Sequence, residues 1–223
     1  MTQDERLNFL IEAFKAESEE YEKLSVPVER DGKRQFLRAL MNVRMPGPMS
    51  AEVLAVQDAY LRERSEEKGI IGLQDIPVIR DGLSVWQGDI TLLAVDAIVN
   101  AANSAMLGCF VPGHNCIDNC IQTYAGVQMR AECDRQMRLM KEKFGRNYVQ
   151  PTSIPMLTEG YNLPAKKVVH IVGPIVTGAL TEKDEKALAD CYTNTLDLCA
   201  REGANSLAFC CISTGVFHFP GKR

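Results

Sequence analysis

The sequence predicts an α/β protein with a mainly parallel sheet covered by helices and preceded by an N-terminal helical extension. After about residue 70, strand-like segments alternate with helix-like segments, which is typical of a parallel sheet with helices on its faces. Before that point, apolar residues recur at helical spacing. We therefore divide the 223-residue chain into a helical extension, residues 1–70, and a sheet domain, residues 71–223.

The extension is expected to hold three helices. The first follows the helical spacing of Leu7, Leu10 and Phe14, and the second spans "RQFLRALMNVR". The prolines of "MPGPM" end the second helix because neither can continue the hydrogen-bond ladder. Ser50 is the expected N-cap of a third helix that runs to about Lys68 and stops at Gly69.

The sheet domain begins with two expected strands, "LSVWQGDIT" and "VDAIVNAAN". Residues 117–143 have helical spacing, and "KKVVHIVGP" has the continuous apolar character of a buried strand. A helix over residues 182–202 and a buried strand in "SLAFCCIST" complete the pattern. Ligands of such sheets bind beyond the carboxyl ends of the strands, so the polar turns "GDIT", "NAAN" and "STGVF" are the candidate site.

Composition narrows the class of protein. The net charge of −4 gives no general attraction to nucleic acid or to an anionic membrane. No apolar run approaches the roughly 20 residues that span a bilayer, and the acidic N-terminus is unlike a signal peptide. The cytoplasm is the expected location, with the eight cysteines reduced. Burial as small apolar groups is expected for five of them: Cys120, Cys133, Cys191, Cys199 and Cys210.

Each polar turn is ambiguous alone. Gly215 permits a left-handed backbone, and successive amides of "STGVF" can form an anion-binding concavity, but plain turns of this composition are common. Asp89 can accept a hydrogen bond from an exocyclic amine or can simply form a turn. The amides of Asn100 and Asn103 can bind sugar hydroxyls or can cap the backbone.

Taken together, "GDIT…VDAIVNAAN…STGVF" resembles the macrodomain family, and "VVHIVGP" is similar to a strand of that family. The resemblance covers roughly residues 78–220. It implies a three-layer α/β/α fold that binds ADP-ribose, and some members hydrolyse ADP-ribose from proteins. It also implies that Asp89 holds the adenine amine beside Ile90, and that Asn103 faces the distal ribose. The pyrophosphate is expected within a loop whose last residue lies near the distal ribose: Ser213, Thr214, Gly215, Val216 and Phe217.

The chain departs from the family pattern in three places. "GCFVPGHNC" replaces the usual glycine-rich loop, and His218 stands where a glycine is usual. The family also has a further helix and strand after the phosphate loop, so we expect the C-terminal elements of this sequence to be short.

The replacement loop contains a candidate metal site. Cys109, His114 and Cys116 have the spacing C-x4-H-x-C, and thiolate and imidazole are favoured zinc ligands. Three protein ligands leave one tetrahedral position open, which is the catalytic pattern. From the loop alone, unmetallated thiols are an equal alternative. A zinc that only pins the loop and a cysteine nucleophile activated by His114 are further alternatives.

The resemblance extends to a zinc-containing subgroup of microbial macrodomains with this kind of insertion and a helical N-terminal extension. That subgroup is linked to sirtuin-type ADP-ribosyltransferases and removes ADP-ribose from a lipoyl-carrier protein related to the glycine-cleavage H protein. The resulting hypothesis is a Zn²⁺-dependent hydrolase in which Asn103 fixes the ribose and Asp118 orients or deprotonates a water. Asp118 can alternatively cap a helix. An ADP-ribose reader with structural zinc and a redox-sensing cysteine protein are the rival functions.

Overall fold

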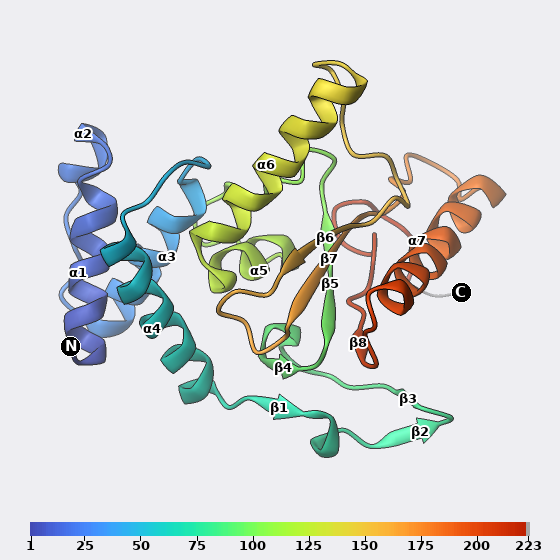
Figure 1. Cartoon of the computed structure of the whole chain (residues 1–223), viewed down its shortest axis with the longest axis horizontal. Coiled ribbons are helices and arrows are strands. Elements are labelled where there is room, and N and C mark those ends of the chain that lie inside the picture. Colours follow the sequence, from blue (N-terminus) through green and yellow to red (C-terminus); the bar gives the residue numbers. More distant parts are fainter. Residues whose placement is uncertain (222–223) are drawn as a thin grey trace.

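A four-stranded sheet in the order β6-β7-β5-β8 forms the centre of the molecule (Figure 1). The structure is a computed structural model that describes residues 1–221. Strand β5 (Ala97–Ala102) runs parallel to β7 (Lys167–Val172) on one side and to β8 (Leu207–Ala208) on the other. Only β6 (Met156–Glu159) is antiparallel, pairing with β7 at one edge. The sheet is therefore mainly parallel, as the sequence predicted.

Helices cover both faces of this sheet and make three layers (Figure 1). Helices α5 (Ile117–Ala125) and α6 (Val127–Phe144) share a core with Ile98 and Val168. Helix α7 (Glu182–Arg201) packs on the opposite face, against Val99 and Val169. Successive strand residues point to opposite faces, so adjacent positions in β5 and β7 supply the two cores. This confirms the predicted α/β/α architecture.

The predicted helical extension is also confirmed, although it holds four helices where three were expected. It consists of α1 (Gln3–Lys15), the short α2 (Glu19–Glu22), α3 (Arg30–Val43) and α4 (Ala51–Lys68). The hydroxyl of Ser50 accepts from the Val53 amide as the N-cap of α4, and Gly69 ends that helix at φ 91°. The extension has its own apolar core, which Val127 at the start of α6 joins.

A buried arginine is one of the links between the extension and the sheet domain. The Nη1 of Arg130 on α6 donates to three carbonyl oxygens at the end of α3: those of Met41, Asn42 and Arg44, at 3.3, 2.9 and 2.6 Å. A cation at a helix C-terminus satisfies carbonyls that have no intrahelical donor and opposes the negative end of the helix dipole.

The strand predicted over "LSVWQGDIT" is mostly wrong. Only β3 (Leu83–Ser84) forms, antiparallel to β2 (Val78–Arg80), and the 3-10 helix η2 (Ile90–Leu92) follows. Trp86 folds so closely over Gly88 that a Cβ there would lie 2.2 Å from its ring, and Asp89 caps η2. Close ring contact and capping both bend the backbone away from an extended path. Strand β1 (Ile71–Gly72), which precedes this region, pairs in parallel with β4 (Leu93–Ala94). The 3-10 helix η1 (Leu73–Asp75) follows β1 directly.

Two further predictions need correction. The buried strand expected in "SLAFCCIST" is reduced to the two partly buried residues of β8, because a turn begins at Cys211, whose carbonyl accepts from Thr214. The helix expected over residues 117–143 is two helices, divided at Gly126, where φ is 100°. Strand β6 was not predicted at all.

The cysteines are all free thiols. Cys133, Cys191 and Cys199 are buried as expected, whereas Cys120 and Cys210 are only partly buried and correct that prediction. Within residues 1–221, no helix combines the length and apolarity needed to cross a bilayer.

Candidate functional site

The candidate site lies at the carboxyl ends of β5 and β8. These strands are hydrogen-bonded neighbours that run in the same direction, so the segments that follow them leave the same edge of the sheet. The segment after β5 carries Asn103 and the cysteine loop, and the segment after β8 carries residues 213–217, the phosphate loop. The topology therefore gathers two of the three predicted turns at one edge.

Two asparagines of the "NAAN" turn hold the carboxylate of Asp118. The Nδ2 of Asn100 donates to Oδ1 of Asp118 at 2.8 Å, and the Nδ2 of Asn103 lies 3.3 Å from Oδ2. The Asn103 side chain also donates to the Gly108 carbonyl and accepts from the Ala105 amide, so its orientation is fixed. Asn103 and Asp118, the two residues predicted to be catalytic, are thus brought into contact.

Asp118 is buried, with 6% of its surface exposed. Burial raises the pKa of its carboxyl to about 6, while the Asn100 hydrogen bond and the charge of Arg130 pull the pKa down. The alternative role of a helix cap is not what the structure shows, because the N-cap of α5 is Cys116. A buried carboxyl with a pKa near neutrality is suited to accepting a proton.

A hydrogen-bond chain continues from Asp118 into the sheet. Asn100 Nδ2 lies 3.0 Å from Nδ1 of His170, and Nε2 of His170 lies 2.9 Å from the Thr158 hydroxyl. Because the Asn100 amide is a donor, His170 accepts at Nδ1 and carries its proton on Nε2. Complete burial lowers the pKa of His170 to about 4, which keeps the ring neutral. Sequence reasoning missed this series of hydrogen bonds, because the alternation of side chains along a strand does not show which residues of neighbouring strands face each other.

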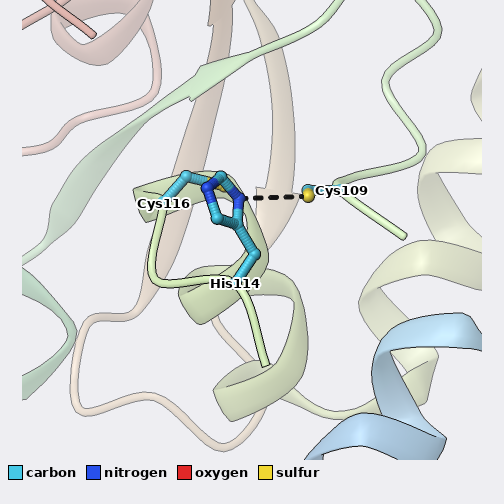
Figure 2. Close-up of side chains that lie close together, drawn as sticks. All are labelled: Cys109, His114 and Cys116. Carbon is cyan, nitrogen blue, oxygen red and sulfur yellow. Dashed lines mark hydrogen bonds between the residues drawn. The ribbon is translucent and has the colours of Figure 1, made fainter. Parts of the chain in front are cut away.

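The three predicted metal ligands converge. One donor atom each of Cys109, His114 and Cys116 lies within 4.8 Å of the others, and Figure 2 shows the three side chains turned toward one another. The Sγ of Cys109 and the Nδ1 of His114 are 3.5 Å apart. Around a tetrahedral zinc ion, a sulfur and a nitrogen ligand lie about 3.6 Å apart, so this pair already has the spacing that zinc requires.

Cys116 connects the three candidate metal ligands, Cys109, His114 and Cys116 (the metal triad), to helix α5. Its Sγ accepts from the Asn119 amide at 3.4 Å as the N-cap of α5, two residues before Asp118. Burial raises the pKa of the Cys116 thiol to about 11, while the Asn119 amide lowers the pKa. Because zinc binds thiolate, a metal at this site displaces the thiol proton, and metal binding is coupled to pH.

Two residues of the helical extension hold the cysteine loop from outside. Arg38 on α3 donates to the His114 carbonyl at 2.6 Å and to Oδ1 of Asn115 at 2.8 Å. One helical turn later, Oδ1 of Asn42 accepts from the Gly113 amide at 2.8 Å. Sequence reasoning missed both residues. Their spacing of four residues puts both side chains on one face of α3. That this face contacts the cysteine loop is evident only from the packing of α3 in the structure.

Asp89 lies at the start of η2, where its Oδ1 accepts from the amide of Thr91 at 3.0 Å and from its hydroxyl at 2.6 Å. Asp89 is exposed, and Oδ2 accepts no hydrogen bond from residues 1–221. The carboxylate thus serves as a turn former and still has one oxygen free for a ligand. Ile90 is half-buried and packs against the apolar core that lies between the sheet and helices α5 and α6.

The phosphate loop exposes a run of backbone donors. Within residues 1–221, the amides of Gly215, Val216 and Phe217 donate to no other group. Thr214, Gly215 and Val216 are exposed, whereas Phe217 is half-buried and its carbonyl accepts from Val176. Consecutive unpaired N–H groups form a concavity that suits an anion.

The sequence predicted that Gly215 could adopt a left-handed backbone conformation, but other residues in and beside this loop adopt it. Ser213 (φ 64°) and His218 (φ 57°) adopt this conformation, whereas Gly215 does not. Position 218 therefore requires the backbone that glycine favours, and the histidine adopts it with some strain. Gly173 is needed for a different reason: a Cβ there would lie 2.0 Å from Oγ of Ser213.

Comparisons with known proteins place the chain in one family. The family model "Macro domain" matches residues 99–223. A protein-ADP-ribose hydrolase from Treponema medium is 49% identical over 227 residues, covering all of this chain and 85% of the relative. A protein-ADP-ribose hydrolase from Staphylococcus aureus (strain MRSA252) is 44% identical over 217 residues, covering 96% of this chain and 79% of the relative.

Solved structures show the same fold. The Oceanobacillus iheyensis macrodomain with ADP is 34% identical, with a TM-score of 0.51 over 60% of this chain and 65%, just under two thirds, of that chain. The Trypanosoma brucei macrodomain in complex with ADP-ribose is 27% identical, with a TM-score of 0.56 over 82% of this chain and 76% of that chain.

Proposed function

Because the chain belongs to the Macro domain family, we propose that it is a protein-ADP-ribose hydrolase that depends on a bound zinc ion. Two relatives at 49% and 44% identity are named protein-ADP-ribose hydrolase, and each alignment covers more than three quarters of the relative. One local observation carries the proposal. The buried carboxyl of Asp118 contacts Asn103, and Asp118 lies two residues after Cys116, the last of the three convergent metal ligands.

ADP-ribose would lie along the edge of the sheet. The free oxygen of Asp89 would accept from the adenine amine, with Ile90 beside the base. The pyrophosphate would bind the unpaired amides of the phosphate loop, residues 213–217, so no basic cluster is needed to hold its charge. Asn103 and Phe217 would then lie at the distal ribose, next to the cysteine loop.

Cys109, His114 and Cys116 would hold the zinc ion, and their number leaves a fourth position open. Bound there, zinc supplies Lewis-acid polarisation of a ribose hydroxyl or of a water. Asn103 orients the ribose, and the carboxylate of Asp118 accepts a proton from the attacking water. Asn100 holds the carboxylate in place, and neutral His170 sets the direction of the Asn100 amide.

The finer parts of the proposal concern substrate and context. We assign residues 1–70 to a helical extension and 71–223 to the macrodomain. The proposed substrate is an ADP-ribosylated lipoyl-carrier protein in the cytoplasm, linked to a sirtuin-type ADP-ribosyltransferase. A link to an ADP-ribosyltransferase in general is supported by a Fusarium oxysporum relative named "probable bifunctional ADP-ribose hydrolase/ADP-ribosyltransferase". It is 37% identical over 214 residues, and the alignment covers 35% of it.

A turnover assay tests the proposal. ADP-ribosylated carrier protein is incubated with the zinc-loaded protein, with chelator-treated protein, and with chelator-treated protein to which zinc is returned. Release of ADP-ribose in the first and third samples alone supports the zinc-dependent hydrolase. Binding of ADP-ribose without release in any sample supports the rival reading, a reader with structural zinc. Absence of ADP-ribose binding in calorimetry would favour a redox-sensing cysteine protein.

A further inference from the structure

A cavity of about 290 Å³ lies between the helical extension and the sheet domain. Its walls come from α3 and α4 on one side and from η2 and α5 on the other. Neither the cysteine loop nor the phosphate loop contributes to the walls among residues 1–221. Thr91, which donates to Asp89, lies in the wall, so the cavity adjoins the proposed adenine end of the ADP-ribose site without sharing its loops. Its volume is close to the lower end of the range of small-molecule sites.

Four cations line the cavity in a regular arrangement. Arg34 and Arg38 lie one turn apart on α3, and Arg64 and Lys68 lie one turn apart on α4. A spacing of four residues puts both members of each pair on one helix face. Like charges at this spacing destabilise a helix, and two such pairs facing one cavity compound the repulsion unless counter-charges are present.

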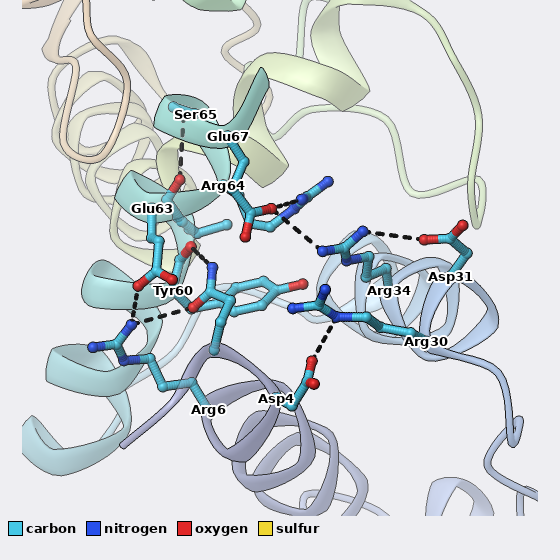
Figure 3. A network of polar contacts seen from close by, with 12 residues as sticks. Asp4, Arg6, Arg30, Asp31, Arg34, Tyr60, Glu63, Arg64, Ser65 and Glu67 are labelled. Carbon is cyan, nitrogen blue, oxygen red and sulfur yellow. Dashed lines mark hydrogen bonds and ion pairs between the residues drawn. The ribbon is translucent and has the colours of Figure 1, made fainter. Parts of the chain in front are cut away.

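Counter-charges neutralise only one half of this group. Arg34 pairs with Asp31 at 3.1 Å and with Glu67 at 3.3 Å, and Arg64 also pairs with Glu67 (Figure 3). Figure 3 shows the hydroxyl end of Tyr60 directed toward the same arginines. Two carboxylates therefore balance two guanidinium groups here.

The other half lacks a carboxylate partner. Within residues 1–221, neither Arg38 nor Lys68 forms an ion pair. The Nη atoms of Arg38 donate to uncharged groups of the cysteine loop and α5, and its buried Nε has no partner among these residues. The charge of Asp89 acts on Lys68 without an ion pair. The Nζ of Lys68 lies 4.0 Å from the centre of the Tyr124 ring, and the guanidinium carbon of Arg38 lies 5.7 Å from the same centre. Two positive charges therefore lie beside one aromatic ring without an ion-pair partner among residues 1–221.

Part of the cavity wall is apolar, beside the polar and charged residues. Leu37, Met41 and Leu61 line it and belong to the buried core of the extension. A bare inorganic anion would leave these walls in contact with water, and a neutral apolar ligand would take Arg38 and Lys68 out of water without compensation. The combination of apolar walls and two unpaired cations fits an organic anion with an apolar body.

We propose that this cavity binds a carboxylate-bearing organic anion, with its carboxylate between Arg38 and Lys68 and its apolar body against Leu37, Met41 and Leu61. The carboxylate can belong to a free metabolite or to an acidic side chain of a partner protein. The proposal does not depend on the proposed hydrolase activity, because it rests only on the cavity and its charges.

Calorimetry with the whole chain tests it, using hexanoate, its neutral isostere hexanamide, and acetate. Hexanoate should bind one to one, about tenfold more tightly than either of the others, because it alone supplies both charge and apolar body. Lys68→Gln should weaken hexanoate binding about tenfold. The matched control is Arg62→Gln, an exposed cation of the same helix outside the cavity, which should leave the affinity unchanged.

Three outcomes would overturn the proposal: hexanamide binding as tightly as hexanoate, an unchanged hexanoate affinity in Lys68→Gln, or displacement of hexanoate by ADP-ribose. Turnover kinetics then separate the two sources of the carboxylate. A raised KM of Lys68→Gln for the modified protein, with unchanged affinity for free ADP-ribose, assigns the site to an acidic side chain of that protein. An unchanged KM together with weakened hexanoate binding assigns it to a free metabolite.

Discussion

Arg38 of helix α3 donates through Nη2 to the carbonyl oxygen of His114 over 2.6 Å, across 76 positions of sequence. The same guanidinium reaches Asn115 and Asn119, so it holds the end of the cysteine loop and the first turn of α5 together. The helical extension thus supports the loop that carries the candidate metal ligands Cys109, His114 and Cys116.

Removing this support should weaken metal binding. Arg38→Ala is expected to raise the zinc Kd about tenfold, because loss of an outer support typically costs ten- to a hundredfold in metal affinity. Competition with a chromogenic chelator measures it. Arg34→Ala, one turn earlier on α3 and outside the loop contacts, should retain the wild-type Kd. Equal zinc affinity in both variants would show that the loop orders itself without the extension.

Cys116→Ala should abolish both zinc content and turnover, because two ligands do not hold the ion tightly. Metal analysis and ADP-ribose release are measured on the same preparation. Cys120→Ala is the control: this cysteine follows one turn later on α5 and is not a member of the triad. Turnover that survives the loss of zinc would end the idea of a catalytic metal.

Asp118→Asn should lower kcat by about 10²-fold or more while ADP-ribose affinity changes little, because the amide keeps the shape of the carboxylate but cannot accept a proton. Single-turnover release of ADP-ribose and calorimetry separate the two effects. A parallel loss of binding and rate would instead assign Asp118 to the architecture of the ribose pocket.

The metal-free protein should show two opposing pH effects on stability. Asp118 has a pKa raised to about 6, so between roughly pH 4 and 6 the folded state keeps a proton that the unfolded state loses, and stability falls as pH rises. His170 has a pKa lowered to about 4, so over roughly pH 4 to 6.5 the unfolded state binds the extra proton, and stability rises with pH. In the wild type the two largely cancel.

Single variants should expose each slope, at most about 1.4 kcal/mol per pH unit. With chelator present, urea unfolding should show stability falling with pH in His170→Gln and rising with pH in Asp118→Asn. Slopes of the same sign in the two variants would contradict the assigned pKa shifts.

Gly173→Ala should disrupt the phosphate loop. The added Cβ would lie 2.0 Å from Oγ of Ser213, so Ser213 must move, and the unpaired amides of residues 215–217 would lose their arrangement. ADP-ribose affinity should fall more than tenfold with zinc content unchanged. Gly47→Ala, where a Cβ meets nothing within 4 Å, is the matched control. Unchanged ADP-ribose affinity in Gly173→Ala would place the pyrophosphate elsewhere.

Local sequence rules accounted for much of the fold. Ser50 and Gly69 marked the ends of α4, since capping depends on residues within one helical turn. A strand-like segment followed by a polar turn marked β5, and a continuous apolar run marked β7. The same rules misread residues 83–91 and 206–214, where ring contact and turn hydrogen bonds bend chains of strand-like composition. The candidate metal triad was visible because all three ligands lie within eight positions of one loop.

By itself, then, the sequence determined the alternating α/β pattern, the helical extension and the Cys109-His114-Cys116 spacing, since each depends on neighbours along the chain. Only the tertiary structure decided that Asn100 joins Asp118 to His170, and that Arg38 holds the loop of His114. These contacts join residues 18, 70 and 76 positions apart. Residues so far apart in sequence come into contact only when whole helices and strands pack together. These contacts are therefore set by the register of the sheet and by the packing of α3 against the cysteine loop, not by local spacing.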